Sequence, residues 1–248
     1  MFAYGEALAG TLPEVNKRLK EAGSSKVYKN LLGITLGTGF GAGVVIDSRL
    51  LTGDNGCGGD VWIMRKKYPE MIAEESVSIR AVRRVYQELT GKDASSLTPK
   101  DIYDIAEGTA EGDQQAAVRS FNELGEMAGD AIIRALNIVD GLVVIGGGVA
   151  GAVKYILPGI MNEMNRQIGT FAGASFPCLQ MEVFNLSEKE AFDKFLKEKD
   201  KMVKIPFSER EVHYACHKKI GIAVSTLGAS RAVALGAYSF ALSQLNIL

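Results

Sequence analysis

The chain has 248 residues, with 28 lysines and arginines against 29 aspartates and glutamates, so its net charge is −1. This balance excludes a strongly basic nucleic-acid-binding surface, and we expect no nucleic acid partner. Apolar residues make up 47% and charged residues 23% of the chain, which is typical of a folded globular protein and not of a disordered one.

No apolar run reaches the roughly 18 to 20 residues that a membrane-spanning helix needs. The start of the chain, MFAYGEALAG, lacks the basic and apolar segments of a secretory signal. We therefore predict a cytoplasmic protein with no membrane partner.

The first third of the chain predicts two helical pieces followed by a meander of strands. Residues 1–10 and 11–22 have helical spacing, and Thr11 with Glu14 forms a capping-box pattern. Three short β-branched runs come next, separated by glycine or Asp-Ser turn signals, which predicts consecutive antiparallel strands. These runs cover residues 31–37, 41–47 and 49–53.

Helical periodicity dominates beyond Pro69. An apolar stripe predicts a helix over residues 76–89, and Thr98, with a proline and an acid after it, marks the start of another. A long helix is predicted over residues 113–137. The run GLVVIGG from residue 141 then predicts a buried strand, followed by a helix that reaches about Ile168.

The last third combines two predicted strands with two predicted helices. Residues 178–184 and 212–215 have the character of strands, and residues 228–245 that of a helix. Residues 187–204 are rich in i,i+4 acid–lysine pairs, so we predict an amphipathic helix there, within a charged helical insertion at 187–210. Its apolar stripe fits either simple core packing or a lid or subunit contact.

One glycine-rich segment, residues 37–42 (GTGFGA), satisfies the letters of the dinucleotide pattern GxGxxG/A. That pattern needs a helix after it, whereas a strand-forming run, Val44–Ile46, follows here. A loop between two strands instead favours phosphate binding by the backbone of Gly37, Gly39 and Gly41, with the Thr38 hydroxyl as a further donor. An ordinary glycine hairpin without a ligand is the competing interpretation.

A second segment, residues 146–151 (GGGVAG), matches the same pattern between a predicted strand and a predicted helix. The acid expected to bind the ribose would be Glu182, which lies farther along the chain than the usual ~20 residues. Further strand–helix–strand units are also missing. We expect Gly146, Gly147 and Gly148 to lie against a nucleotide, and a dinucleotide-binding enzyme remains a weaker alternative.

The two glycine segments together resemble the nucleotide-contacting segments of the sugar kinase and actin-like ATPase fold, and above all those of the ROK family (repressors, open reading frames and sugar kinases). The family's LGTGxGxG loop is matched by residues 36–43 (LGTGFGAG), and its GxNGxAGExGH segment by residues 53–60 (GDNGCGGD). Its adenosine segment is matched by residues 144–149 (VIGGGV), and its late helix by residues 234–237 (ALGA). Order and approximate spacing agree over nearly the whole chain.

This resemblance implies an α/β fold of the ribonuclease H-like, actin/hexokinase type, with a mixed sheet flanked by helices. Residues 1–248 would form the large C-terminal lobe, which binds nucleotide and sugar. The implied cofactor is ATP with Mg²⁺ at the two glycine segments, and the implied sugar ligands are Asn55, Gly56 and Asp60. Asp60 stands where the family has a sugar-binding glutamate, and a simple turn carboxylate is the alternative. A homodimer is implied by analogy.

Three features of the family have no match in this sequence. Its first phosphate loop, DxGGT, is absent, and so is the Asn-Asp pair that supplies the general base, since the chain starts at the helix that follows that pair. The family's zinc histidine aligns near Ile63, and no cysteine lies in residues 62–71. We expect no zinc site and identify no catalytic residue.

The functional expectation is therefore part of an ATP-dependent hexose kinase of the glucokinase type, inactive as this chain alone. A non-catalytic ROK-type sugar-sensing or regulatory protein is the alternative. Cys57, Cys178 and Cys216 form no paired pattern, so neither a disulfide framework nor a cysteine metal site is predicted. His213 and His217 lie on a predicted strand, whose spacing does not favour a shared metal.

Overall fold

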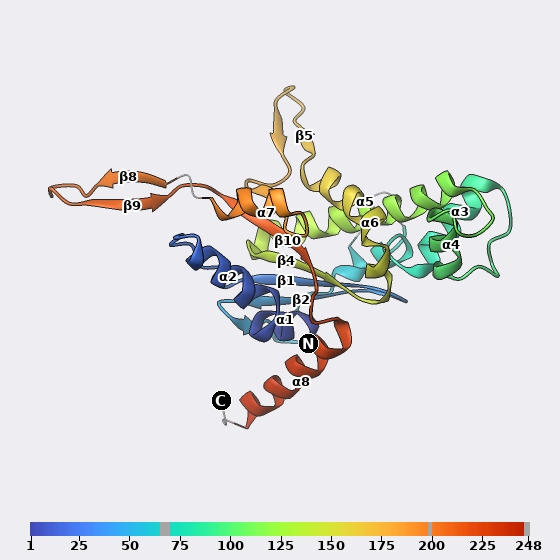
Figure 1. The fold of residues 1–248 in the computed structure, drawn as a ribbon, viewed down its shortest axis with the longest axis horizontal. Helices are drawn as coiled ribbons and strands as arrows, with labels where there is room; N and C mark the ends of the chain where they lie inside the picture. Colours follow the sequence, from blue (N-terminus) through green and yellow to red (C-terminus); the bar gives the residue numbers. More distant parts are fainter. Residues whose placement is uncertain (65–69, 198–199, 246–248) are drawn as a thin grey trace.

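The computed structural model describes residues 1–64, 70–197 and 200–245. Its centre is a six-stranded mixed sheet with strand order β3-β2-β1-β4-β10-β7, and helices cover both faces of the sheet (Figure 1). Strands β1, β4, β10 and β7 run parallel, whereas β2 and β3 continue from β1 as an antiparallel meander. The strands of the sheet are β1 (Leu31–Leu36), β2 (Phe40–Ile46), β3 (Arg49–Leu50), β4 (Leu142–Gly146), β7 (Glu182–Asn185) and β10 (Lys219–Val224).

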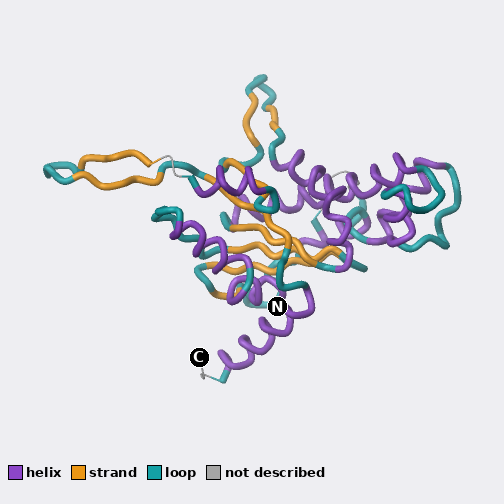
Figure 2. The backbone as a smooth tube through the Cα atoms, viewed as in Figure 1, coloured by secondary structure: helices purple, strands orange, loops and turns teal. Residues whose placement is uncertain are grey.

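The helices form two layers, one on each face of the sheet (Figure 2). One layer contains α3 (Ile79–Thr90), α4 (Pro99–Ala106), α5 (Gln114–Val139) and α6 (Val153–Met164). The other contains α1 (Phe2–Ala9), α2 (Thr11–Glu21), α7 (Lys189–Leu196) and α8 (Ala229–Gln244). The described residues also include three short 3₁₀ segments: η1 (Val61–Ile63), η2 (Ala73–Glu75) and η3 (Gly148–Ala152).

The apolar runs of the central strands are explained by burial on both faces. In β1, Ile34 faces the α5–α6 layer and Leu31 the α1–α2 layer, and both are fully buried. In β4, Val143 and Val144 divide in the same way. Parallel strands that are covered on both faces are hydrophobic throughout, without the alternation of a half-exposed strand.

The first and last helices pack directly against each other at close range. A Cβ on Gly5 of α1 would lie 1.9 Å from the carbonyl oxygen of Ala232, and one on Gly236 of α8 would lie 2.1 Å from that of Met1. Only glycine allows this separation, so the two ends of the chain form one contact on the same side of the sheet.

Thr98 caps α4 as predicted. Its hydroxyl accepts the Asp101 N–H at 3.2 Å, and the Asp101 carboxylate accepts the Thr98 N–H at 2.7 Å. The bonds from the Thr98 hydroxyl and N–H hold the pKa of Asp101 below its usual value. The reciprocal bonds satisfy two backbone donors at the start of the helix.

We expect Thr98→Ala to lower the melting temperature by about 2–4 °C, because the helix loses its cap. Folding lowers the pKa of Asp101. The contribution of this carboxylate to the stability of the fold is therefore complete above its unfolded pKa, and it is lost as the pH falls through its folded pKa. The difference in melting temperature between wild type and Thr98→Ala should therefore narrow in acid. Scanning calorimetry from pH 7 down to pH 3 measures it, and a constant difference over that range would contradict the capping role of the carboxylate.

Several predicted elements have different bounds in the structure. The charged helix predicted over residues 187–204 is wrong beyond Leu196: residues 198–199 lie outside the described residues, and a two-stranded ribbon of β8 (Asp200–Lys204) and β9 (Glu211–Ala215) follows. This ribbon projects from the body (Figure 1). Lys204 pairs with Glu209 across the ribbon and not within a helix, which explains why the i,i+4 pattern misled.

Three further differences are smaller. The helix predicted to reach Ile168 ends at Met164, and a hairpin of β5 (Gln167–Gly169) and β6 (Ser175–Pro177) follows it. Thr11 is inside α2 and does not cap it; its hydroxyl donates to the buried Glu6 carboxylate at 2.9 Å. Within the described part of the chain, no helix combines the length and apolar character needed to cross a membrane.

Candidate functional site

The two glycine segments adjoin each other at the same end of the sheet. Strands β1 and β4 pair in parallel, with Thr35 opposite Gly146, so the loops that follow them start side by side. Gly147 has φ +100° and ψ 170°, a conformation confined almost entirely to glycine, and a Cβ there would lie 2.2 Å from the Leu36 carbonyl oxygen. The structure therefore brings the Thr38 loop and the Gly147 loop into contact.

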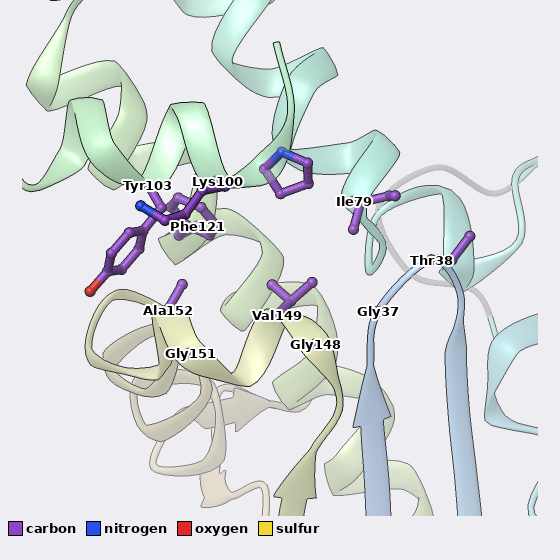
Figure 3. Close-up of a pocket in the computed structure, with 11 residues that line it drawn as sticks. Gly37, Thr38, Ile79, Lys100, Tyr103, Phe121, Gly148, Val149, Gly151 and Ala152 are labelled. Carbon is purple, nitrogen blue, oxygen red and sulfur yellow. The ribbon is translucent and has the colours of Figure 1, made fainter. Parts of the chain in front are cut away.

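A cavity of about 560 Å³ opens beside these loops (Figure 3). Gly37 and Thr38 lie at one end of it, and the η3 residues Gly148, Val149, Gly151 and Ala152 form one wall. The opposite wall comes from α3, α4 and α5, through Ile79, Pro99, Lys100, Tyr103 and Phe121. At one end of the cavity the glycine loop exposes backbone groups, and the rest of the lining is largely apolar. This combination is typical of a site for a small organic ligand.

The glycine loop is supported from behind by α3. The first N–H of that helix, on Ile79, donates to the Gly37 carbonyl at 3.1 Å. Within the loop, the Gly37 N–H donates to the Gly39 carbonyl at 3.1 Å. These bonds fix the position of a loop whose Thr38 side chain is exposed.

A second cavity, of about 390 Å³, is lined by the same loop. It shares Gly37 and Thr38 with the larger cavity and also includes Gly147 and Glu74. Glu74 Oε2 accepts the Phe40 N–H at 3.0 Å, and its other oxygen lies 3.2 Å from Arg80 Nη2. A carboxylate is thus fixed beside the glycine loop, and the loop forms the boundary between two cavities.

No sequence pattern predicted that Glu74, Lys100 or Tyr103 would line these cavities. Lys100 and Tyr103 are on the helix that Thr98 caps, and nothing in a helical pattern distinguishes them from other exposed or half-exposed positions. Glu74 is one of two adjacent acids before α3. The Glu74 carboxylate lies at a loop more than thirty residues earlier in the chain, and a local sequence pattern cannot show such a contact.

The predicted nucleotide ligands divide into two groups. Gly37, Thr38, Gly39, Gly147 and Gly148 line one or both cavities. Gly41 also lines the smaller cavity, as Gly39 and Gly147 do, and a Cβ on it would lie 2.7 Å from the Thr35 hydroxyl oxygen. Gly146 is buried, and a Cβ there would lie 2.6 Å from the Phe2 ring, so this glycine serves helix packing.

The predicted sugar ligands lie apart from both linings. Asn55, Gly56 and Asp60 are exposed on the loop between β3 and η1. This loop packs on β2, since a Cβ on Gly59 would lie 3.2 Å from the Ala42 carbonyl oxygen. Residues 65–69, in the stretch that aligns with the zinc cluster of the family, lie outside the described residues.

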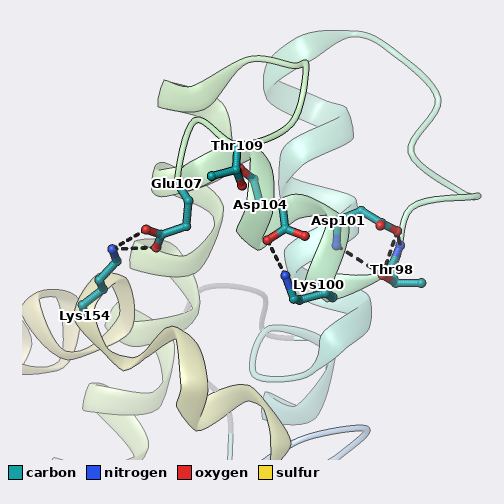
Figure 4. Close-up of polar contacts among 7 residues, drawn as sticks. All are labelled: Thr98, Lys100, Asp101, Asp104, Glu107, Thr109 and Lys154. Atoms are coloured by element: carbon teal, nitrogen blue, oxygen red, sulfur yellow. Dashed lines mark hydrogen bonds and ion pairs between the residues drawn. The ribbon is translucent and has the colours of Figure 1, made fainter.

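Two ion pairs lie on and around α4 (Figure 4), and of their side chains only Lys100 lines the larger cavity. Lys154 of α6 pairs with Glu107, just after α4, at 2.6 Å, and Lys100 pairs with Asp104. The hydrogen bond from Lys154 holds the pKa of Glu107 below its usual value, and the bond to Glu107 raises the pKa of Tyr103. The Lys154–Glu107 pair thus links the start of α6 to the end of α4.

Among the described residues, no group of three or more histidine, cysteine, aspartate or glutamate side chains is placed to hold a metal ion. His217 Nε2 contacts Glu182 Oε2 at 2.7 Å, at the exposed start of β7. The His213 side chain is outside the described set.

Comparisons with known proteins agree with this geometry. The profile of the ROK family matches residues 18–188, more than half of the chain. A glucokinase from Parabacteroides distasonis ATCC 8503 has a solved structure with 56% sequence identity and a TM-score of 0.89, over 98% of this chain and 66% of that one. This chain therefore spans slightly less than two thirds of that relative. A search of curated proteins by sequence gave no match.

Two more distant structures show the same fold. The ROK hexokinase of Thermus thermophilus has 17% identity and a TM-score of 0.57, over 95% of this chain and 60% of that one. A ROK family glucokinase from Streptomyces griseus, solved with glucose and AMPPNP, has 18% identity and a TM-score of 0.52, over 91% of this chain and 66% of that one. The predicted actin/hexokinase-type fold is confirmed, and this chain belongs to the ROK family.

Proposed function

We propose that this chain carries the nucleotide-binding and part of the sugar-binding machinery of an ATP-dependent, glucokinase-like hexose kinase. The observation that supports this proposal is the position of the glycine loop between two cavities that share Gly37 and Thr38. A kinase needs a donor site and an acceptor site that meet at the phosphoryl group to be transferred. The larger cavity would take the nucleotide, and the smaller one the sugar hydroxyl.

The phosphates would be held by backbone N–H groups of residues 37–39 and of Gly147 and Gly148, with the Thr38 hydroxyl as an added donor. Glu74 would accept a hydrogen bond from the sugar in the smaller cavity. The sugar would also contact Asn55, Gly56 and Asp60. These contacts require the exposed loop that carries the three residues to move toward Glu74 when the sugar binds.

Mg²⁺ would accompany ATP. This ion is bound mainly by phosphate oxygens and water, with one or two protein carboxylates, and it neutralises charge on the phosphates. Glu74 is a carboxylate beside the glycine loop and fits contact with such a water shell.

The chain spans 66% of the P. distasonis glucokinase. Sugar phosphorylation, the activity of a whole kinase, is therefore part of the proposal for this chain. We infer that this chain binds ADP or ATP at its glycine loops. A dimeric state and a cytoplasmic location also stay predictions. The dinucleotide alternative finds no support in the sheet, which has an antiparallel meander where a doubly wound sheet has parallel strands.

Isothermal titration calorimetry with ADP and Mg²⁺ tests the nucleotide site. We expect Gly39→Val to weaken ADP binding at least about tenfold, equivalent to about 1.4 kcal/mol, because its Cβ would lie 2.5 Å from Glu74 Oε2 and its side chain would cover the loop. The control is Gly169→Val in the β5–β6 hairpin, where the nearest atom to a Cβ is 3.8 Å away. Absence of ADP binding by the wild type, or equal affinities for the wild type and Gly39→Val, would overturn the proposed function.

A further inference from the structure

A groove of about 750 Å³ runs along β7, the strand at one edge of the central sheet. Every residue of the strand, Glu182–Asn185, lines this space, which we call the β7 groove. One wall is formed by α6 and the other by α7, which lie on opposite faces of the sheet. The β7 groove shares no lining residue with the two cavities at the glycine loops, so it is a separate site.

The floor of the β7 groove is an open strand edge. The Glu182 N–H donates to the Lys218 carbonyl, on the β10 side, at 2.9 Å. Alternate residues of a strand in a parallel pair bond to the same neighbour, so Val183 and Asn185 direct their N–H groups away from β10. Within the described ranges of the chain, no strand pairs with that side of β7. The groove therefore offers backbone hydrogen bonds to an added strand.

The two walls of the β7 groove differ in character. The α6 wall is largely apolar, and its residues include Val153, Leu157 and Met161. The α7 wall is largely polar and charged, and its residues include Glu188, Glu190 and Lys194. Successive side chains of a strand point to opposite faces, so an added strand would face α6 with one set of side chains and α7 with the other. A strand with one apolar and one charged face fits this groove.

The β8–β9 ribbon has such a two-sided pattern. Val203 is opposite Val212 in its register, and Tyr214 lies on the same face. These three side chains are 42%, 43% and 59% exposed. The opposite face of the ribbon includes the charged pair Lys204 and Glu211. The apolar face is thus in solvent, although it has the composition of a face that packs on another element.

A two-stranded ribbon is at best marginally stable in water unless one of its faces is covered. This ribbon projects from the body, no residue of it lines the β7 groove, and Phe207 at its tip is fully exposed (Figure 1). Its own groove therefore does not cover it. A second copy of the chain supplies both an apolar wall for the ribbon and a strand for the open edge.

We propose that the β8–β9 ribbon of a second copy adds to the open edge of β7, with its apolar face on α6 and its charged face on α7. Charges of both signs then find partners, since Lys204 would meet the acids of the α7 wall and Glu211 would meet Lys194. About a twofold axis each copy gives one ribbon and accepts one, so the same contact is used twice and the buried area doubles. The resulting dimer leaves both cavities at the glycine loops outside the contact.

Sedimentation velocity over a range of protein concentrations measures the dissociation constant of the dimer. Ala191→Arg puts a long side chain into the β7 groove and should raise this constant at least about tenfold. Asp193→Arg is the control, because Asp193 lies on the same helix outside the groove lining. On the ribbon, Val203→Lys should have the same effect. Its control is Phe176→Lys, at a position 53% exposed in the β5–β6 hairpin.

A mixing experiment separates this contact from other ways of forming a dimer. Ala191→Arg keeps an intact ribbon and Val203→Lys an intact groove, so the mixture should form a heterodimer through one intact contact. This recovery should occur at a concentration where neither variant dimerises alone. A dimer in which ribbon meets ribbon, or groove meets groove, would show no recovery, and that result would overturn the proposal.

Two further results would also overturn it: a wild type that stays monomeric at every concentration, and a dimer that Ala191→Arg and Val203→Lys leave unchanged. Far-UV circular dichroism shows whether each variant keeps the fold of the wild type. If Ala191→Arg disturbs α7, Glu190→Lys repeats the test from an exposed position of the same wall. It should weaken the dimer because it sets a lysine against Lys204 of the incoming ribbon.

Discussion

Gly147→Ala should lower the free energy of unfolding by about 2–4 kcal/mol and remove detectable ADP binding. The backbone at Gly147, with φ +100° and ψ 170°, is strained for any residue with a Cβ. The added atom would also lie 2.2 Å from the Leu36 carbonyl oxygen and 2.7 Å from the Leu36 nitrogen. Both neighbours are backbone atoms of β1, so relief requires the two strands to separate where the two glycine loops begin.

The matched control is the next residue. A Cβ on Gly148 would have no atom within 4 Å, and its φ is outside the range that favours glycine, so Gly148→Ala should keep the stability of the wild type. Urea denaturation measures the first effect and titration with ADP the second. Equal stability of the two variants would show that β1 and β4 do not meet as closely as the structure indicates.

Lys219→Met should lower the free energy of unfolding by about 2–3 kcal/mol. Lys219 is 2% exposed, and its Nζ donates to the carbonyls of Phe195 at 2.6 Å and Lys197 at 3.0 Å. These carbonyls are at the C-terminal end of α7, where the helix dipole favours a positive charge. Methionine fills a similar volume but donates nothing, so carbonyls at the end of α7 lose a charged donor in a buried place.

Lys218→Met is the control, because Lys218 is adjacent, exposed and otherwise alike. Hydrogen exchange adds a local readout: amides of α7 should exchange faster in Lys219→Met, while those of α5, on the opposite face of the sheet, change only with global stability. If α7 keeps its protection in Lys219→Met, its anchoring depends on the aromatic contacts of Phe195 with Tyr28 and Phe184 instead.

The same lysine explains why one central strand could not be predicted from the sequence. Strand β10 reads KIGIAV and begins with a charged residue after a histidine and another lysine, which in a sequence indicates an exposed segment. In the fold, β10 lies between β4 and β7, and the charge of Lys219 is buried because the end of α7 accepts its hydrogen bonds. A contact between residues far apart in the chain decides the burial, and no local pattern contains it.

Elements with strong local signals were predicted well. The β1–β2 hairpin, the long helix α5 and the capped helix α4 all lie where β-branched runs, apolar periodicity and the Thr98 cap placed them. The ribbon of β8 and β9 was not predicted, because its charges fit helical spacing as well as strand spacing.

For the candidate site, glycine patterns and family resemblance predicted the residues of the two glycine loops. A backbone that must approach another backbone closely requires glycine, and such glycines can be recognised in the sequence. Thr38 and Gly147 do line one cavity. The residues that give the site its side-chain chemistry, Glu74, Lys100 and Tyr103, are ordinary polar residues of helices and loops. Their positions follow from how α3 and α4 pack, which a single sequence does not encode locally.

The contact between α1 and α8 has a consequence for how the chain folds. Phe2 and Ala3 of α1 are part of the core, yet α8, the helix that covers α1, is synthesised long after it. In a newly made chain, α1 must either pack on the sheet without α8 or stay undocked until α8 has been synthesised. Closure between such distant segments is slow because it orders the whole intervening chain. Release of nascent protein before α8 is complete should therefore yield a species prone to aggregation.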